Sequence, residues 1–547
     1  MATALPADGH GTIHQFPRRN PTGKADVNAA SQAPGTMLQE MLDNSAPGDC
    51  VYLAPGTYKL TEPLAIRHDL FMLGFDDADG RKVVLDFDGG RLVPALPLLR
   101  VEDNAKVVIS TIQFAYSHDV DNADPVKAAQ THAIRVFSGA LELRSCTVIS
   151  TVSGVDVREG ATFTGVSTDL SVACVGVEAS GRAHLHRGTV AGCAVGLRAA
   201  TEPSNVSSDE ALFVSCGAGV VVEELAEAMV RNTHMKECKV GVAVRSHSTR
   251  ADPVSVIGST FRECGRGVFI QGQCCNPTVA KCTFEHCTAS GVCIDSGSPQ
   301  LTGCAVTNTP IGIEVLAGEA TITECAVEEF SDVGILVSGP ATMPRIVKCL
   351  IRADATGQRE RATEVVVGAV AQSLMAGAAA LLDDAAVTAL PPTVPTIGIA
   401  IEETSAPHVE DTTFDNNDIN ICGLGACGVV EANLLGVTEF DNVVYVGATS
   451  DVVIQENDIM GTRRGTGVGV YSGARATVRR NKLDSVQLAG VTLRSCGETT
   501  VTENEITACQ DAVVVMGSSV GKSHRNQTDL ATVVFTDAAA TFTAATR

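Results

Sequence analysis

Tryptophan is absent from this chain of 547 residues, and aromatic residues make up only 4% of it. A large globular core built around aromatic side chains is therefore disfavoured. Glycine is frequent, with 51 residues, and valine, alanine and threonine occur throughout. This composition favours thin β layers and disfavours a fold dominated by helices.

Basic residues are also few, with 40 lysines and arginines against 63 aspartates and glutamates, which gives a formal net charge of -23. Binding to nucleic acid or to an anionic membrane requires a positive field, which this chain lacks overall. We therefore expect no nucleic-acid partner and no membrane partner.

An export signal is missing as well, because the first residues, MATALPADGHGTIHQF, contain no charged segment followed by an apolar one. We accordingly expect an intracellular, cytoplasmic protein, with a cytoskeletal or flagellar setting as one option. The 19 cysteines are then expected to be reduced thiols, since disulfide frameworks belong to oxidising compartments.

A short phrase, glycine followed by an apolar residue, any residue and a second apolar residue, recurs along the chain. From Gly219 to Gly334 its copies lie 21 to 26 residues apart. The copies begin at Gly154, Gly219, Gly241, Gly267, Gly291, Gly312, Gly334, Gly398, Gly467 and Gly490, with Asp511 in the glycine position of a further copy. A period of this length predicts a solenoid.

Each copy alternates apolar and polar residues over a few positions, then turns and continues into a second short strand. Stacked coils of this kind pair every strand in parallel with its copy one coil away. The predicted fold is all-β, a right-handed parallel β-helix with a short N-terminal cap helix at residues 36–42 and one helical insertion.

Like residues should stack into ladders in such a fold. One column is Cys282, Cys304, Cys325 and Cys349, and a second is Cys193, Cys216, Cys238, Cys264 and Cys287. The first column continues as Asn433, Asn457, Asn481 and Asn504. We expect the thiols to fill a narrow core and the amides to bond to one another along the stack.

The expected organisation has five parts. They are an N-terminal extension (1–33), a first half of the β-helix with cysteine ladders (34–352), an insertion loop with a helix (353–396), a second half with the asparagine ladder (397–518) and a C-terminal tail (519–547). The insertion is expected either to pack on the flank of the β-helix or to dock a partner.

The segment TMLQEML and the phrase PGD…VYLAPGTY that follows it resemble the N-terminal cap and first coil of the pectate-lyase-like right-handed β-helix superfamily. The resemblance covers about 34–516 and specifies fold more than activity. It implies an option in carbohydrate chemistry, since many members cleave or epimerise acidic polysaccharides. The polygalacturonate hydrolases combine four motifs on neighbouring coils. In this chain the GHG motif occurs only at Gly9 to Gly11, upstream of the cap helix and without its companion motifs, and coincidence explains it best.

The candidate binding residues are seven basic side chains: Arg463, Arg464, Arg475, Arg479, Arg480, Lys482 and Arg494. Such a patch suits an acidic protein tail, a phosphate group or an anionic sugar, and lyases of this superfamily use arginine as a base. The register also places Arg475 beside Glu498 on the next coil, so some of these charges are expected to form ion pairs.

Three other groups of residues are candidate sites. Asp411, Asp415 and Asp418 form a carboxylate group that a turn explains, His184 and His186 share one side of a strand, and Cys274 and Cys275 occupy strand positions. We predict no catalytic residues, no metal and no cofactor.

The first functional hypothesis is a non-enzymatic intracellular scaffold that presents a β-helix side face to protein partners in a larger assembly. The alternative is a carbohydrate-active enzyme, a polysaccharide lyase or glycoside hydrolase that acts on acidic glycans. Contact of Asp411, Asp415 or Asp418 with the arginines at 475–494 would favour the alternative.

Overall fold

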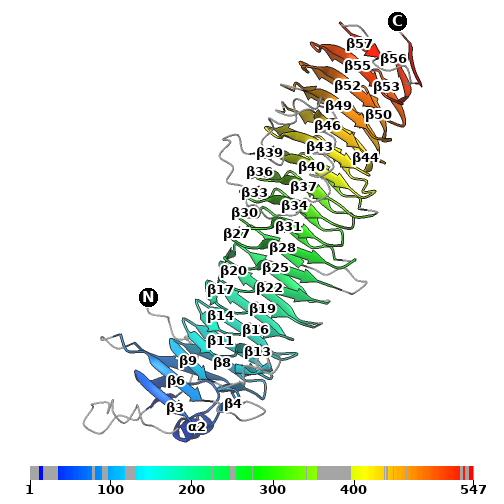
Figure 1. The fold of residues 1–547 in the computed structure, drawn as a ribbon. Coiled ribbons are helices and arrows are strands. Elements are labelled where there is room, and N and C mark those ends of the chain that lie inside the picture. Colours follow the sequence, from blue (N-terminus) through cyan, green and yellow to red (C-terminus); the bar gives the residue numbers. More distant parts are fainter. Residues whose placement is uncertain are drawn as a thin grey trace. The chain divides into compact units, whose positions relative to one another are not determined.

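The computed structural model describes residues 12–16, 35–76, 80–88, 96–117, 130–201, 203–224, 226–246, 254–273, 275–340, 342–353, 396–436, 438, 442–447, 449–462, 465–529, 534–535 and 541–545. The chain divides into two units, Met1–Cys264 and Gly265–Arg547. Each unit is a right-handed parallel β-solenoid with three sheets, named A, B and C in the order in which a coil visits them (Figure 1). The predicted fold class is confirmed.

Sheet A of the first unit consists of β1 (Ile13–Phe16), β2 (Asp49–Leu53), β5 (Leu70–Gly74), β8 (Lys106–Ser110), β11 (Ala140–Arg144), β14 (Thr162–Val166), β17 (Arg182–His186), β20 (Asn205–Asp209), β23 (Glu227–Arg231) and β26 (Val254–Ile257). Sheet B consists of β3 (Gly56–Leu60), β6 (Val83–Asp88), β9 (Ile112–Ser117), β12 (Thr147–Ser150), β15 (Asp169–Val172), β18 (Thr189–Ala191), β21 (Leu212–Val214), β24 (His234–Lys236) and β27 (Thr260–Arg262). Sheet C consists of β4 (Leu64–Ile66), β7 (Leu99–Val101), β10 (His132–Val136), β13 (Ser153–Val157), β16 (Val175–Ala179), β19 (Val195–Ala199), β22 (Ala218–Glu223) and β25 (Val240–Arg245).

Sheet A of the second unit consists of β29 (Thr278–Ala280), β32 (Gln300–Thr302), β35 (Thr321–Thr323), β38 (Arg345–Val347), β41 (His408–Glu410), β44 (Cys427–Glu431), β47 (Asp451–Gln455), β50 (Arg475–Arg479), β53 (Glu498–Thr502), β56 (Val520–His524) and β59 (Thr541–Ala545). Sheet B consists of β30 (Thr283–Glu285), β33 (Ala305–Thr307), β36 (Ala326–Phe330), β39 (Leu350–Ala353), β42 (Thr413–Asp415), β45 (Leu434–Leu435), β48 (Asp458–Met460), β51 (Lys482–Asp484), β54 (Glu505–Thr507) and β57 (Gln527–Thr528). Sheet C consists of β28 (Arg266–Gln271), β31 (Ser290–Ile294), β34 (Ile311–Val315), β37 (Val333–Val337), β40 (Ile397–Glu402), β43 (Ile419–Leu424), β46 (Asn442–Gly447), β49 (Thr466–Tyr471), β52 (Ala489–Arg494), β55 (Asp511–Met516) and β58 (Val534–Phe535).

Strands also lie at both ends of the chain, outside the region in which the repeat was visible. Strand β1 pairs in parallel with β2, and β56 pairs with β59. Most of the expected insertion, residues 354–395, lies outside the described residues. Its predicted helix therefore stays a prediction.

The predicted cap helix is α2 (Gly35–Asn44), which lies beside β3 and β4 (Figure 1). Leu38 and Leu42 are buried beneath it. The side chain of Gln39 accepts a hydrogen bond from the Ala65 amide at 2.8 Å and donates one to the Ala65 carbonyl at 2.9 Å. The helix thus satisfies backbone groups that the first strand of sheet C would otherwise leave unpaired.

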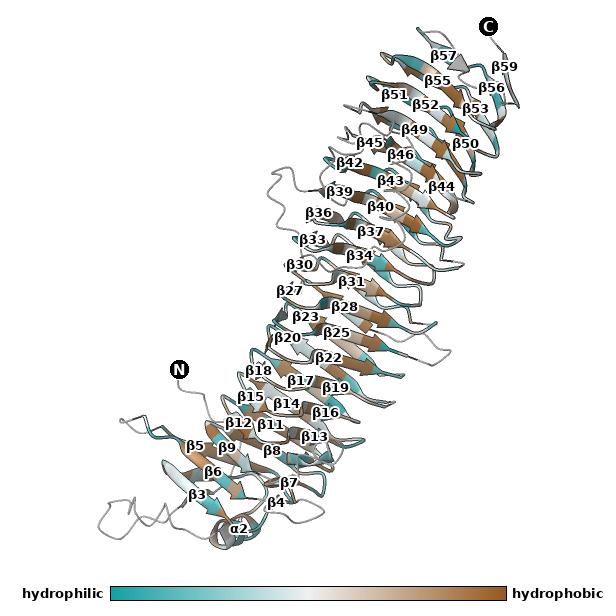
Figure 2. Cartoon of the chain, in the orientation of Figure 1, coloured by the Kyte–Doolittle hydropathy of each residue, from teal (hydrophilic) through white to brown (hydrophobic). Residues whose placement is uncertain are grey.

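Hydrophobic residues concentrate on the strands of all three sheets, as Figure 2 shows. Alternate residues point inward, so Val306 and Ile322 are fully buried while their strand neighbours are partly exposed. Close packing between coils explains why glycine recurs in the repeat. A Cβ atom on Gly312 would lie 2.2 Å from the Cγ1 atom of Val327 and 2.5 Å from the Gly334 carbonyl oxygen, so only glycine fits there.

The two cysteine columns are confirmed. Cys282, Cys304, Cys325 and Cys349 each precede a strand of sheet B in the second unit and are 1 to 3% exposed. In the first unit the Sγ atoms of Cys193 and Cys216 are 3.4 Å apart. Burial raises the pKa of the Cys146 thiol, which occupies the first-column position between β11 and β12, to about 11. These thiols act as small apolar core groups.

The asparagine column is also confirmed, and it continues by one residue to Asn526. From Asn457 onward, the Oδ1 atom of each asparagine accepts hydrogen bonds from the backbone amide and the Nδ2 atom of the preceding one, at 2.9 to 3.0 Å. Each Nδ2 atom also donates to a strand carbonyl, as Asn457 does to Val430. The ladder members Asn433, Asn457, Asn481 and Asn504 are 1 to 2% exposed.

Replacing Cys304 by aspartate is expected to destabilise the protein by several kcal/mol, because the substitution buries a carboxylate between the apolar coils. Cys304→Ala is the matched control and is expected to cost about 1 kcal/mol. Urea denaturation followed by circular dichroism measures both variants. Equal midpoints for Cys304→Asp and the parent protein would show that this position faces solvent.

Candidate functional site

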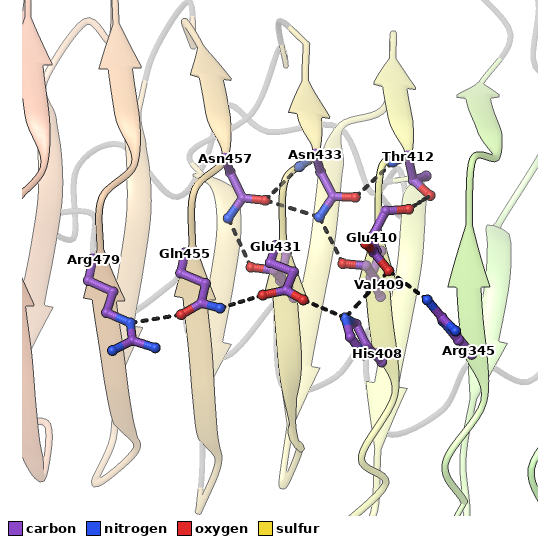
Figure 3. Close-up of polar contacts among 11 residues, drawn as sticks. Arg345, His408, Val409, Glu410, Thr412, Glu431, Asn433, Gln455, Asn457 and Arg479 are labelled. Carbon is purple, nitrogen blue, oxygen red and sulfur yellow. Dashed lines mark hydrogen bonds and ion pairs between the residues drawn. The ribbon is translucent and has the colours of Figure 1, made fainter.

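The outer face of sheet A in the second unit carries a row of polar side chains from successive strands. The register aligns Glu410 with Glu431, Glu431 with Gln455, and Gln455 with Arg479. Adjacent strands of a sheet are about 4.8 Å apart. One functional side chain is therefore presented at each step along the face, as Figure 3 shows.

Two carboxylates lie side by side in this row, and a histidine lies beside both. The Nε2 atom of His408 is 2.8 Å from Glu431 Oε1 and 4.0 Å from Glu410 Oε2. Arg345 is 3.0 Å from Glu410, and Gln455 donates a hydrogen bond to Glu431 (Figure 3). We call these five residues the carboxylate–histidine cluster.

The cluster is open to solvent on one side. The side chains of His408, Glu410 and Glu431 are 40%, 34% and 24% exposed. The hydrogen bond from Gln455, with the bond and positive charge of His408, holds the pKa of the Glu431 carboxyl below its ordinary value. Glu431 is therefore an ionised carboxylate that a bound molecule can reach.

Replacing Gln455 by leucine is expected to raise the pKa of Glu431 towards its ordinary value of 4.5, because the largest stabilising interaction of the carboxylate is lost. The lowered pKa stabilises the folded state above the ordinary pKa, and this contribution is lost as the pH falls through the folded-state value. An NMR titration of the glutamate carboxyl carbons measures the shift.

The matched control for that titration is Gln300→Leu, which changes an exposed glutamine on β32 of the same sheet. It is expected to leave the pKa of Glu431 unchanged. An unchanged Glu431 titration in Gln455→Leu would contradict the hydrogen bond drawn in Figure 3.

The row continues towards β56 with basic residues. Arg479 donates from Nε to the Gln455 side chain at 2.7 Å, and Arg475 aligns with Asp451 on the preceding strand. Lys522 and His524 line an open depression on β56 together with Glu498. Within the described residues, Arg475, Arg479, Lys522 and His524 form no ion pair, and we call these four residues the basic end.

The structure describes five of the seven basic residues singled out in the sequence and places them on different faces. Arg475 and Arg479 lie together on sheet A, and Lys482 lies on sheet B between Asp458 and Glu505. Arg480 lies in the turn after β50 and pairs with Glu456 at 2.9 Å, whereas Arg494 ends β52 of sheet C. Arg463 and Arg464 lie outside the described residues.

The expected neighbour of Arg475, Glu498, follows in the same register on β53. No ion pair joins their side chains in the part of the chain that the structure describes. The carboxylates at 411–418 lie three coils from Arg475, on the order of 14 Å. Asp411 occupies a turn with a φ of 51°, and buried Asp418 accepts hydrogen bonds from Thr396, so both have structural roles.

The histidine and cysteine candidates are not brought into a metal site. His184 bonds Ser207 at 2.6 Å, and His186 lies 3.5 Å from Asp209. Cys275 is buried, and Cys274 lies outside the described residues. Among the residues that the structure describes, no group of three or more potential ligands is arranged to hold a metal ion. The described helix is also too short to cross a membrane.

A second charged cluster lies on the outer face of sheet C in the first unit. Asp156 and Glu178 are register neighbours there. Arg135 and Arg158 bind Asp156 at 2.8 and 2.9 Å, and Arg198 lies 3.4 Å from Glu178. Asp156 is only 4% exposed. Because its carboxylate is enclosed by its arginine partners, this cluster is an ion-pair network that supports the sheet.

Sequence reasoning missed His408, Glu410, Glu431, Gln455, Lys522 and His524. Their signal is the outward position of sheet A in successive coils, which becomes readable only once the register is known. None of them belongs to a short motif, since each comes from a different strand or alternates with a buried residue.

Comparison with solved structures finds several distant likenesses. An alginate lyase of polysaccharide lyase family 6 in complex with a trisaccharide has 9% identity and a TM-score of 0.38, over 78% of this chain and 87% of that one. The catalytic domain of a GH87 α-1,3-glucanase has 10% identity and a TM-score of 0.36, over 64% of this chain and 66% of that one. An N-terminal fragment of gene product 12 of bacteriophage Phi29 has 9% identity and a TM-score of 0.36, over 92% and 89%.

These likenesses are too distant to transfer an activity, and no curated protein sequence matches the chain. They nevertheless correct one expectation. The prediction of a non-enzymatic scaffold is contradicted, because the similar structures include polysaccharide lyases and a glycoside hydrolase, which belong to the carbohydrate-active alternative. We withdraw the scaffold hypothesis.

A family match covers a later part of the chain than the cap helix and the first coil. The right-handed β-helix region matches residues 173–327, 251–445 and 442–529, which together exceed half of the chain. The chain belongs to the right-handed β-helix family.

Proposed function

We propose that this protein is a carbohydrate-active enzyme that cleaves an acidic polysaccharide on the outer face of sheet A in its second unit. The observation that carries the proposal is the pair Glu410 and Glu431, held in register on neighbouring strands with His408 beside both. Cleavage of a glycosidic bond requires one group that donates a proton and a second, ionised group that acts as a base or nucleophile.

Glu431 is suited to the ionised role, because Gln455 and His408 lower its pKa. His408, within 4.0 Å of both carboxylates, is placed to pass a proton to or from the leaving oxygen together with Glu410. Glu410 and Glu431 project from aligned positions of neighbouring parallel strands, which lie about 4.8 Å apart. This spacing is of the order of the separation that glycosidases with a covalent intermediate use between carboxyl groups.

The surroundings of the pair suit an extended chain of sugars. The face is built from parallel strands of similar direction, so a polysaccharide lying across them meets an equivalent position at every coil. Arg345 and Gln455 flank the two carboxylates and supply hydrogen-bond donors on either side. Such donors orient sugar hydroxyl and carboxyl groups.

Incubation with purified polymers tests this function. Alginate and polygalacturonate are the acidic substrates, an α-1,3-glucan is the neutral comparison, and each is tested with and without Ca²⁺. The measurement is the release of reducing ends and of unsaturated products, which distinguishes hydrolysis from elimination. Release of oligomers from an acidic polymer is the expected result, and no release from any acidic polymer contradicts the proposal.

A further inference from the structure

Beyond the carboxylate–histidine cluster, the outward side chains of the same face change from acidic to basic. Beyond Gln455 the outward residues of sheet A include Arg479 on β50 and both Lys522 and His524 on β56. Threonines occupy the outward positions aligned with them on β53, since Thr500 aligns with Lys522 and Thr502 aligns with His524. The basic end therefore forms one surface with the cluster, along β44, β47, β50, β53 and β56.

The cationic side chains of this surface have hydrogen-bond donors that a ligand could use. Arg479 uses Nε for Gln455, and its guanidinium group has further donors. Lys522 is exposed, and within the described residues it forms no ion pair. The side chains of Thr477 and Thr500 lie half-buried between these charges, whereas the hydroxyl oxygen of Thr502 is buried.

The spacing of the surface suits a particular ligand. Arg479 is two strands from Glu431 and His524 is four strands from it, which corresponds to about 10 and 19 Å. One sugar ring advances an extended polysaccharide by a distance close to the spacing of the strands. Charged groups on a glycan would therefore meet Arg479 and the pair Lys522 and His524 in turn.

We infer that the basic end is a binding subsite for the carboxylate groups of sugar residues about two to four positions from the bond that is cleaved. This inference rests on the proposed function and adds to it a substrate class, polymers of uronic acids, and a minimum length. Chains of two or three sugars that occupy the cluster do not reach Lys522 and His524, so they bind without the contribution of those residues.

Isothermal titration calorimetry on a Glu431→Gln background tests the subsite without turnover. The ligands are hexasaccharides of alginate and of polygalacturonate, the corresponding disaccharides, and the hexasaccharides after reduction of their carboxyl groups. In the double variant Arg479→Gln/Lys522→Gln we expect hexasaccharide affinity to fall by about tenfold or more, because two charge-assisted contacts are lost. Disaccharide affinity should not change.

The matched control is Lys482→Gln, which removes an exposed lysine of sheet B near in sequence but on another face. It should leave hexasaccharide affinity unchanged. Equal affinity of the double variant and its parent for the acidic hexasaccharides, or equal binding of the acidic and carboxyl-reduced forms, overturns the inference.

The two proposals fail in different ways. Hexasaccharide binding that depends on Arg479 and Lys522, in a protein that cleaves no acidic polymer, supports the subsite and removes the enzymatic function. Cleavage of acidic polymers with a KM that is the same in the parent protein and in Arg479→Gln/Lys522→Gln supports the function and removes the subsite.

Discussion

Replacing Asn481 by leucine is expected to lower the free energy of unfolding by about 4 kcal/mol, since several buried hydrogen bonds are lost at once and each unsatisfied group costs about 1 to 3 kcal/mol. The Oδ1 atom of Asn481 accepts from the amide and the Nδ2 atom of Asn457, and its own Nδ2 atom donates to Ile454 and Asn504. Leucine has a similar size but can form none of these bonds.

Hydrogen–deuterium exchange read by mass spectrometry locates this effect, and urea denaturation measures its size. Exchange should rise in β47 and β50, on either side of the broken ladder. Asn526→Leu is the graded control, because Asn526 is partly exposed and ends the ladder, so its loss should cost less. Equal stability of Asn481→Leu and the parent would mean that water replaces the amide ladder.

Replacing Glu431 by glutamine is expected to reduce cleavage of an acidic polymer by about 10²-fold or more, the contribution usual for a positioned acid or base. Glutamine keeps the size and the hydrogen-bonding ability of the side chain but cannot be ionised. The melting temperature should stay close to that of the parent, because Glu431 lies on the outer face and remains 24% exposed. Initial rates of product release measure the loss.

The matched control for this variant is Glu505→Gln, which alters an exposed carboxylate on sheet B. It is expected to keep full activity. A Glu431→Gln protein with the activity of the parent would remove Glu431 from the reaction and would direct attention to another part of the face.

The coils and ladders could be predicted from the sequence because they depend on like residues at a nearly constant spacing. Cys304 and Cys325 are 21 residues apart, Asn457 and Asn481 are 24 apart, and both pairs are buried in adjacent coils, so a nearly constant spacing was enough. The repeated glycine is equally readable, because close packing between coils requires it.

The conformation of the corners could not be predicted in the same way. Lys281, Glu324, Lys348, Glu456 and Arg480 all have a φ between 53° and 57°, although residues of these types seldom adopt it. Hydrogen bonds to the neighbouring coil fix this conformation, as from the Arg480 amide to the Thr502 carbonyl at 3.1 Å. The residue types themselves gave no signal; the only mark of these positions is that each directly precedes a cysteine or asparagine of the first column.

The candidate site escaped prediction because its register crosses the interruption of the repeat. Arg345 and Glu410 are 65 residues apart in the chain, whereas Glu431 and Gln455 are 24 apart. The expectation that the basic residues at 475–482 form one patch was wrong for a related reason. Within these few residues the chain leaves sheet A, turns a corner and enters sheet B, so neighbours in sequence face different directions.

The asparagine ladder also restricts how the length of this protein can change. Asn433 and Asn457, like Asn457 and Asn481, are 24 residues apart, and in each pair the Nδ2 atom of the first asparagine donates to the Oδ1 atom of the second. Removing residues 457–480 would bring Asn433 against Asn481 and restore the same bonds. The next two coils, from Asn481 to Asn504 and from Asn504 to Asn526, have 23 and 22 residues and keep the same bonds, so the corners of a coil absorb a difference of one or two residues. A larger change in length is expected as a whole coil, or as extra residues in a connection from sheet B to sheet C, where residues 354–395 are placed in the sequence.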